Sequence, residues 1–260
     1  MKGGGLVVGK YPNTKLGNTK HLISNVALRK HYPETHMATA KQVQRMLERY
    51  RMVYVKPNVG TGGHGVMKAE RLTRSGKMKY RFKLGTMERQ FTTYPAFYAA
   101  LRHAFRGRSY VVQRGIRMLT YRKRPFDIRI MVQLNRSGRW THTGTIGRLA
   151  HPKRIVTNYH SGGTPLPLER LMRPYLRGAR MTRFARRIAA LGVRTALHMQ
   201  QGYPRLKEAG VDVGVDRKLR PWIFEVNFRP DPFIFLKLGK PAVFRRIIDL
   251  TRYHGRFRKK

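Results

Sequence analysis

The sequence GVDVGVDRKLRPWIFEVN, residues 210–227, spans two runs in which apolar residues alternate with others, 211–215 and 222–228, the second of which ends one residue beyond it. A polar turn separates the two runs, and Pro221 stands at its far edge. Alternation with period two is typical of strands, and a polar turn between two such runs predicts a β-hairpin. The hairpin matters for function because several of the few acidic residues of the chain lie in it.

The register of this hairpin predicts a metal site. If Asp216 faces Pro221 across the turn, Asp212 lies opposite Glu225, and Asn227 shares the face of Glu225. Two adjacent carboxylates repel unless a cation lies between them, and hard oxygen ligands of this kind suit Mg²⁺ or Mn²⁺. The alternative is a solvated hairpin face with incidental acids. Against it, the apolar second run indicates a buried strand, where unpaired carboxylates are costly.

The composition is strongly basic. The chain has 56 Lys and Arg against 12 Asp and Glu, which gives a net charge of +44 in 260 residues. Such a charge implies an acidic partner, which could be a nucleotide, a nucleic acid, an anionic polymer or an anionic surface. Composition does not choose among these. Because 41% of the residues are hydrophobic and 10% aromatic, the chain is expected to bury a core and not to be a disordered basic tail.

The sequence shows no targeting or membrane segment. There is no Cys, which excludes a disulfide framework and thiolate chemistry and agrees with a reducing compartment. The apolar run in MKGGGLVVGK is too short for a signal peptide, and no run reaches the roughly 18 apolar residues of a membrane span. We therefore expect a cytoplasmic protein.

Strands joined mostly by hairpins, with helices between them, predict an α+β fold with antiparallel sheets rather than a doubly wound parallel fold. Helices are predicted over residues 20–30, 39–50, 95–105, 180–201 and 241–253, and strands over 52–56, 66–69, 78–83, 109–113, 127–134, 140–146 and 155–157. Residues 1–19 are predicted to form a basic N-terminal arm, and residues 20–260 a single domain.

A glycine-rich loop follows the first predicted strand. In YVKPNVGTGGHGV, residues 54–66, Lys56 ends an apolar run directly before four glycines. Without Cβ atoms, such a loop lets backbone N–H groups approach phosphate oxygens, and the lysine adds a point charge. A dinucleotide or Walker A loop is disfavoured because a strand follows and no Lys-Ser or Lys-Thr closes it. A lid over a nucleotide fits better, and the alternative is a mobile hairpin tip.

The strand RPFDIRIMVQL, residues 124–134, carries an isolated carboxylate. Asp127 is the only acidic residue between Glu88 and Glu169, and alternation places it on one face with Arg129. The guanidinium of Arg129 suits bidentate contact with a phosphoryl or carboxylate group. The alternative is a structural Asp127–Arg129 pair on a solvated strand.

The polar segment TNYHSGG, residues 157–163, is either a second anion-binding loop or an ordinary turn. His64 and His160 are not assigned a catalytic role, because neither has a histidine or glutamate partner at zinc-ligand spacing.

These segments, in this order, resemble the ATP-grasp superfamily and, within it, the endospore coat-associated proteins of the YheC/YheD type. The resemblance covers residues from about 20 to 238. It rests on HYPET (31–35), VYVKPNVGTGGHG (53–65), VVQRGI (111–116), RPFDIRIMVQ (124–133), IVTNYHSGG (155–163), and GVDVGVD (210–216) followed by IFEVN (223–227).

The resemblance implies that two α+β subdomains clamp ATP together with Mg²⁺ or Mn²⁺. It implies that Lys56 contacts phosphate, that the glycine loop covers the triphosphate, and that residues 113–116 line the adenine. The predicted site residues are Lys56 and Arg129 as catalytic groups, Lys56, Gly60, Gly62, Gly63, Gly65, Gln113, Ile116 and Asp127 as nucleotide-binding groups, and Asp212, Glu225 and Asn227 as metal ligands.

Two features depart from the superfamily. Most ATP-grasp enzymes carry a separate N-terminal α/β domain that helps to hold the substrate, and almost nothing precedes the ATP-binding part here. The strong basic charge is not a superfamily trait either. We therefore expect the acceptor to be an acidic peptide or another anionic polymer, with non-specific nucleic-acid binding at low salt.

By analogy with the superfamily, we expect a Mg-ATP-dependent carboxylate–amine ligase that proceeds through an acyl phosphate. One alternative is an ATP-dependent phosphotransferase, because the phosphoryl step is shared. The other is a basic nucleic-acid or spore-associated binding protein on an ATP-grasp scaffold.

Overall fold

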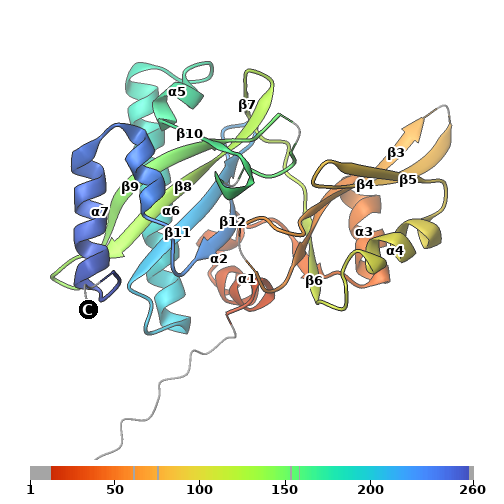
Figure 1. Cartoon of the computed structure of the whole chain (residues 1–260), viewed down its shortest axis with the longest axis horizontal. Coiled ribbons are helices and arrows are strands. Elements are labelled where there is room, and N and C mark those ends of the chain that lie inside the picture. Colours follow the sequence, from red (N-terminus) through yellow and green to blue (C-terminus); the bar gives the residue numbers. More distant parts are fainter. Residues whose placement is uncertain (1–12, 61, 75, 153, 158, 258–260) are drawn as a thin grey trace, which may run out of the picture.

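The computed structural model describes residues 13–60, 62–74, 76–152, 154–157 and 159–257. Two antiparallel sheets form the two ends of an elongated molecule, with α1 and α2 between them (Figure 1). The α+β prediction is confirmed. The helices are α1 Lys15–Ser24, α2 Val26–Arg29, α3 Ala40–Tyr50, α4 Tyr94–His103, α5 Leu168–Met172, α6 Gly178–Gly202 and α7 Pro241–Tyr253, with 3₁₀ turns η1 Tyr159–Ser161 and η2 Phe233–Leu238.

The first sheet has the strand order β1-β6-β2-β3-β4-β5 and packs against α3 and α4. Alternation in β2 buries Val53 and Val55, while the helical spacing of α3 buries Val43, Met46 and Leu47 against them. This packing fixes β2, whose other face then points toward the second sheet. The strands are β1 Thr35–Met37, β2 Met52–Pro57, β3 Met67–Arg74, β4 Lys77–Leu84, β5 Met87–Phe91 and β6 Tyr110–Arg114.

The second sheet has the order β10-β9-β8-β11-β12, with β7 paired to β8. Helix α6 covers one face, and α7 with η2 covers the other (Figure 1). Both faces of β8 are therefore buried, Ile130 on the α6 side and Met131 on the α7 side. The strands are β7 Thr120–Tyr121, β8 Arg124–Leu134, β9 Trp140–Leu149, β10 Thr164–Leu166, β11 Glu208–Val215 and β12 Pro221–Asn227.

The acidic hairpin forms as predicted, but its strand register at the turn differs from the predicted one. Asp212 lies opposite Glu225, which confirms the predicted pair. The predicted turn pairing of Asp216 with Pro221 is wrong, because Val215 pairs with Pro221. A register shift next to Asp212 adds one residue to β12 and restores the pair. Bulges of this kind are common beside active sites, where they redirect side chains.

Two other predicted elements need correction. The helix predicted from residue 20 starts at Lys15, and Asn25 breaks it by capping α2 through Ala27 N and Leu28 N. Residues 13–19 therefore belong to the folded part, and residues 1–12 of the predicted arm lie outside the described residues. The strand predicted at 155–157 is wrong, since no strand forms there among the described residues.

Within the described ranges, none of the helices combines the length and the apolar composition that crossing a membrane requires.

Candidate active site

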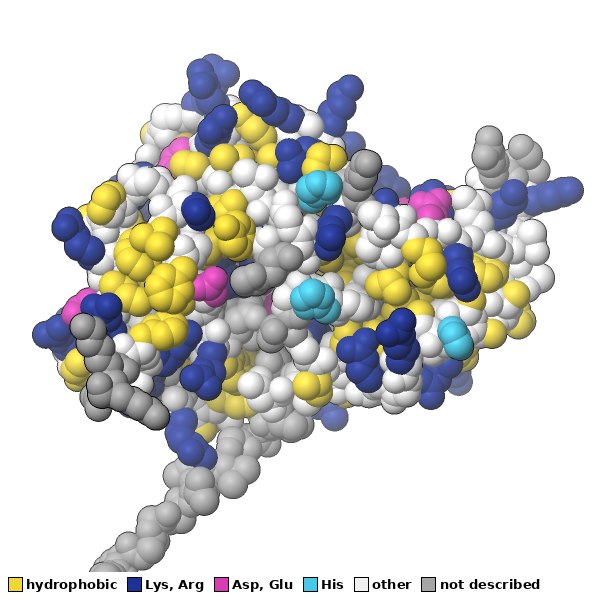
Figure 2. Space-filling view, in the orientation of Figure 1, with side chains coloured by type: hydrophobic (Ala, Val, Ile, Leu, Met, Phe, Trp, Pro, Cys, Tyr) yellow, Lys and Arg dark blue, Asp and Glu magenta, His cyan; other side chains and the backbone are white. Residues whose placement is uncertain are grey.

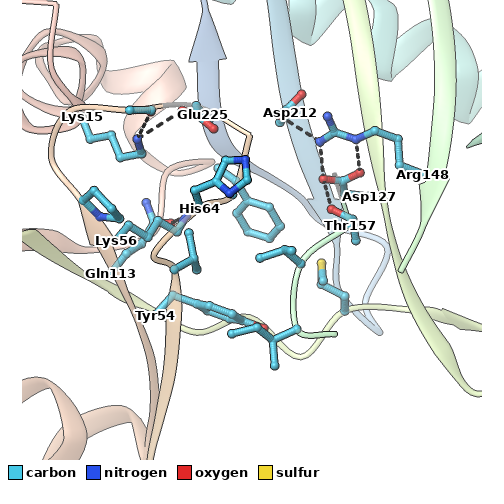
Figure 3. A pocket seen from close by; sticks show the side chains of 18 of the residues that line it. Lys15, Tyr54, Lys56, His64, Gln113, Asp127, Arg148, Thr157, Asp212 and Glu225 are labelled. Atoms are coloured by element: carbon cyan, nitrogen blue, oxygen red, sulfur yellow. Dashed lines mark hydrogen bonds and ion pairs between the residues drawn. The ribbon is translucent and has the colours of Figure 1, made fainter. Parts of the chain in front are cut away.

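A pocket opens between the two sheets, with the glycine loop, β2 and β6 on one side and β8, β9, β11 and β12 on the other (Figure 3). The predicted site residues that line it are Lys56, Gly60, Gly63, Gln113, Asp127, Asp212 and Glu225. Those that do not line it are Gly62, Gly65, Ile116, Arg129 and Asn227. The structure thus brings two remote parts of the chain to one pocket, while Ile116 is buried and does not line it.

Lys56 projects into this pocket from the end of β2. Its Nζ donates to Gln113 Oε1 at 2.6 Å, and Gln113 Nε2 donates to Thr35 Oγ1 at 3.0 Å. Burial lowers the pKa of Lys56 to about 8, although the nearby carboxylate of Glu225 raises it. Gln113 therefore positions a lysine whose charge is poorly solvated, and such a cation gains most from an anionic ligand.

The glycine loop adopts backbone conformations that favour glycine. Gly60, Gly62, Gly63 and Gly65 all have positive φ. A Cβ at Gly65 would come within 2.9 Å of the Tyr110 hydroxyl, so a side chain there would push the loop off the sheet. Ser161 Oγ donates to the Gly62 carbonyl at 3.2 Å, which joins this loop to the second polar segment across the pocket. Thr61 and Asn158, in these two segments, lie outside the described residues.

Lys15 is a pocket residue that the sequence interpretation missed. Its Nζ donates to the Gly60 carbonyl at 2.7 Å and lies 3.4 Å from Glu225 Oε1. The backbone N–H of Lys15 also donates to the Asn58 carbonyl, which fixes the start of α1 on the glycine loop. The sequence did not indicate Lys15 because α1, with Gly and Asn in its first turn, lacks a clear helical pattern. Lys15 was therefore included in the predicted N-terminal arm.

A buried ion cluster forms the opposite wall of the pocket (Figure 3). Arg148 donates to both carboxylate oxygens of Asp127, at 2.8 and 2.6 Å, and its Nη2 lies 2.9 Å from Asp212 Oδ2. Arg129 donates to the same Asp212 through Nε and Nη2, and Thr157 Oγ1 donates to Asp127 at 2.6 Å. All five side chains are buried, so the two carboxylates and two guanidinium groups neutralise one another.

This cluster has clear electrostatic consequences. Burial alone would raise the pKa of Asp212, but the guanidinium groups of Arg129 and Arg148 outweigh it and hold the pKa below its usual range. Burial acts to lower the pKa of Arg148, and the charges of Asp127 and Asp212 reverse that effect and raise it. The pocket wall therefore favours the ionised forms of Asp212 and Arg148.

The structural alternative for β8, a solvated Asp127–Arg129 pair, is wrong. The strand is buried, Asp127 pairs with Arg148, and Arg129 pairs with Asp212. Of the two guanidinium groups in this cluster, that of Arg148, which the sequence interpretation did not single out, lines the pocket, and that of Arg129 does not. A register counted from the turn at residues 135–138 would place Gly147 opposite Asp127, and the shift between Met131 and Val132 puts Arg148 there instead.

The donors predicted for a metal ion fit Mg²⁺ in their chemistry. Asp212 and Glu225 are paired residues of the hairpin that both line the pocket, and Asn227 Nδ2 lies 3.3 Å from Asp212 Oδ2. Their side chains offer hard oxygen ligands of the kind that Mg²⁺ prefers. Among the described residues, no group of three or more His, Cys, Asp and Glu side chains is arranged to hold a metal ion. A site here would thus combine two carboxylates with the amide oxygen of Asn227.

Comparison with known proteins places this architecture in the ATP-grasp class. The solved structure of the ATP-grasp ligase PsnB with a minimal precursor superposes with a TM-score of 0.53 at 10% identity, over 92% of this chain and 60% of that chain. Two antiparallel α+β lobes that face each other across a pocket are thus an ATP-grasp fold.

The YheC/D like ATP-grasp family matches residues 7–254, and the chain belongs to that family. The endospore coat-associated protein YheD of Bacillus subtilis (strain 168) is 26% identical over 72% of this chain and 41% of its own length. YheC of the same organism, also an endospore coat-associated protein, is 20% identical over 76% of this chain and 54% of its own length. The matched regions therefore span about half the length of these two relatives.

Proposed function

We propose that this protein is a Mg-ATP-dependent ligase that joins a carboxylate to an amine through an acyl phosphate. The observation that carries the proposal is the convergence of Lys15, Lys56 and Arg148 with Asp212 and Glu225 in one pocket between the two lobes. Three cations and two carboxylates at one place provide both a phosphate site and a metal site. Membership of the ATP-grasp family supports the choice of nucleotide.

The walls of the pocket suggest how ATP binds. Its apolar lining suits an adenine ring and includes Tyr54, Val66, Met118, Ile155, Val156 and Phe224. Lys15 and Lys56 lie next to the glycine loop, where they would meet the phosphates together with the loop backbone. We assign contact with the terminal phosphate to Arg148, on the opposite wall, a role that the sequence interpretation gave to Arg129.

Asp212, Glu225 and Asn227 would hold the magnesium ion, which supplies charge neutralisation between the phosphates when bound. The proposed reaction has two steps. A carboxylate oxygen of the acceptor attacks the γ-phosphorus, and the bond to ADP breaks. The amine then attacks the carbonyl carbon, and phosphate leaves. Lys56 and Arg148 stabilise the charge that develops on the transferred phosphoryl group.

The basic surface supports an acidic acceptor. Figure 2 shows Lys and Arg side chains over much of the visible face and few carboxylates. A surface of this kind concentrates a polyanion near the pocket, which favours a glutamate-rich peptide or another carboxylate polymer as acceptor. The endospore coat association of the two relatives extends the proposal to a place of action at the spore.

The first test is stabilisation by ligand. Mg²⁺ with ATP should raise the melting temperature clearly, whereas ATP with EDTA should give at most a small shift, because metal and nucleotide share one site and stabilisation follows occupancy. Thermal melts with ATP, Mg²⁺, both, or neither measure this. An equal shift with and without metal would remove the metal role from Asp212 and Glu225.

Lys56 supplies a second test, in the form of proton uptake. Because its pKa is lowered to about 8, the lysine is partly deprotonated near pH 8 in the free protein. Phosphate oxygens beside it would raise that pKa, so ATP binding near pH 8 should take up a fraction of a proton. Calorimetry in two buffers of different ionisation enthalpy measures the uptake. A Lys56→Met variant should lose it, and the same uptake in both proteins would show that Lys56 does not meet the phosphates.

A further inference from the structure

A separate cavity of about 300 Å³ lies at the tip of the β11–β12 hairpin, where the hairpin meets α6. Its charged lining consists of Arg187 and Arg194 from α6 and Lys218 and Arg220 from the hairpin turn. Four cations from two distant segments therefore converge on one concave space.

The local structure explains this convergence. Arg187 and Arg194 are seven residues apart on α6, so they project from the same face of the helix. The Arg187 side chain donates to the Leu219 carbonyl, which holds the hairpin turn against the helix. Leu219 has a φ of 57°, a left-handed conformation at the centre of the turn that places Lys218 and Arg220 on either side of it.

Among the described residues, no carboxylate lines this cavity. The nearest acid in the sequence, Asp216, accepts hydrogen bonds from Lys218 N at 2.9 Å, Arg220 N at 3.0 Å and Trp222 Nε1 at 2.9 Å. Its oxygens are thus committed to the turn itself. None of the ion pairs among the described residues involves these four cationic side chains, although the charge of Arg220 helps to lower the pKa of Asp216. The four cations therefore repel one another across the cavity with the carboxylate of Asp216 nearby.

The positive charges around the cavity act on the pKa of His31. His31 lines the cavity, and its Nδ1 lies 3.0 Å from the Pro221 carbonyl oxygen. Burial lowers the pKa of His31, and the charges of Lys30, Arg194 and Arg187 lower it further, while the contact with Pro221 acts in the opposite direction.

We propose that this cavity is a second anion site, separate from the nucleotide pocket, that binds a phosphate group. A phosphate dianion offers several acceptor oxygens and can contact three guanidinium groups and an ammonium group at once, whereas a single carboxylate has two oxygens and one charge. The cavity volume lies at the lower end of the range for small-ligand sites. The occupant is either a free phosphate compound or a phosphate group of a polymer.

The site is close to the nucleotide pocket but does not share its residues. Trp222 contacts the guanidinium groups of both Arg114, which lines the nucleotide pocket, and Arg220, at 5.1 and 5.7 Å from the ring centre. The backbone N–H of Ile223 donates to the His31 carbonyl, which ties β12 to the chain that enters the first sheet (Figure 1). The proposal therefore goes beyond the ligase function and does not depend on it.

The test is calorimetric binding of inorganic pyrophosphate in EDTA at fixed ionic strength. An Arg187→Gln/Arg194→Gln variant should bind at least tenfold more weakly than the wild type. An Arg183→Gln/Arg186→Gln variant removes the same charge from exposed residues of the same helix and should change binding less than twofold. Equal weakening in both variants would show only general charge attraction and would overturn the site.

Further variants guard against a folding defect and against binding in the nucleotide pocket. Lys218→Gln/Arg220→Gln leaves α6 intact and should weaken binding as strongly as the α6 variant. Lys56→Met should leave this binding unchanged, and a loss there would assign the anion to the nucleotide pocket and contradict the proposal. The α6 and turn variants should keep the wild-type thermal shift with Mg-ATP. That shift measures the nucleotide pocket and pyrophosphate binding measures the proposed anion site, so the two proposals are tested separately.

Two more ligands test the phosphate assignment and its source. Triglutamate should bind at least tenfold more weakly than pyrophosphate, and equal binding would overturn the assignment to phosphate. A polyphosphate chain is compared with pyrophosphate at equal phosphate concentration. Tighter binding of the chain supports a polymer as the source, and equal affinity supports a free phosphate compound.

Discussion

An Arg148→Met variant is expected to lose about 3–5 kcal/mol of folding free energy, the size seen when one partner of a buried ion pair is removed. Arg148 is 3% exposed and is the residue that contacts both Asp127 and Asp212. Without it, the buried carboxylates of Asp127 and Asp212 keep Arg129 as their guanidinium partner within the cluster, and two negative charges face one positive charge there. Urea unfolding measures the loss, and the catalytic activity should disappear as well.

The matched control for Arg148 is Arg136→Met. Arg136 also pairs with an aspartate, Asp249, at 3.1 Å, but both side chains are more than half exposed. Exposed pairs contribute about 1 kcal/mol or less. If both variants lost stability equally, the buried cluster would not be the electrostatic centre of the second lobe.

A Glu225→Gln variant should keep its stability and lose its activity. Glutamine preserves the volume of the side chain, and the lost contact with Lys15 is a partly exposed ion pair that contributes about 1 kcal/mol or less. The missing charge removes a proposed magnesium ligand, so ATP turnover should fall by about two to three orders of magnitude, the effect of losing one preorganised electrostatic contact.

Glu88→Gln serves as the control for this second variant. Glu88 is a partly exposed glutamate that pairs with Arg81 at 3.2 Å in the first sheet, remote from the pocket. It should retain wild-type turnover and melting. Near-normal turnover in Glu225→Gln would contradict the metal-ligand assignment.

The comparison of sequence with structure shows which features local patterns determine. Alternation and turn residues were enough to predict the acidic hairpin, and helical spacing predicted α7 over its observed bounds, Pro241–Tyr253. The hairpin residues Asp212 and Glu225, which line the pocket, were predicted as a pair, although the assumed turn pairing was wrong and the bulge in β12 compensates for it. These features depend on short-range periodicity, which a single sequence displays.

The features that sequence did not predict depend on tertiary structure. Arg148 faces Asp127 because of a one-residue register shift in the β8–β9 pair, and a bulge leaves no distinct mark in the sequence. Lys15 lies close to Glu225 because α1 packs on the glycine loop. In the chain, Lys15 is 45 residues from Gly60 of that loop and 210 residues from Glu225, so no local pattern indicates these contacts. Arg129 was predicted to contact phosphate. Its partner in the structure is Asp212, which lies opposite it on the neighbouring strand β11, and the sequence of β8 alone does not reveal that pairing.

ATP turnover with defined acceptors tests whether the pocket uses ATP to activate a carboxylate. We expect a carboxylate-rich peptide or polymer, with an amine present, to stimulate release of ADP and not AMP and to yield a covalent amide product. The stimulation should depend on Mg²⁺, Lys56 and Glu225, while DNA and RNA of equal charge should have no effect, because charge attraction alone binds polyanions in a salt-sensitive way without chemistry. The account would be contradicted if nucleic acid bound tightly above physiological salt while no carboxylate acceptor changed turnover.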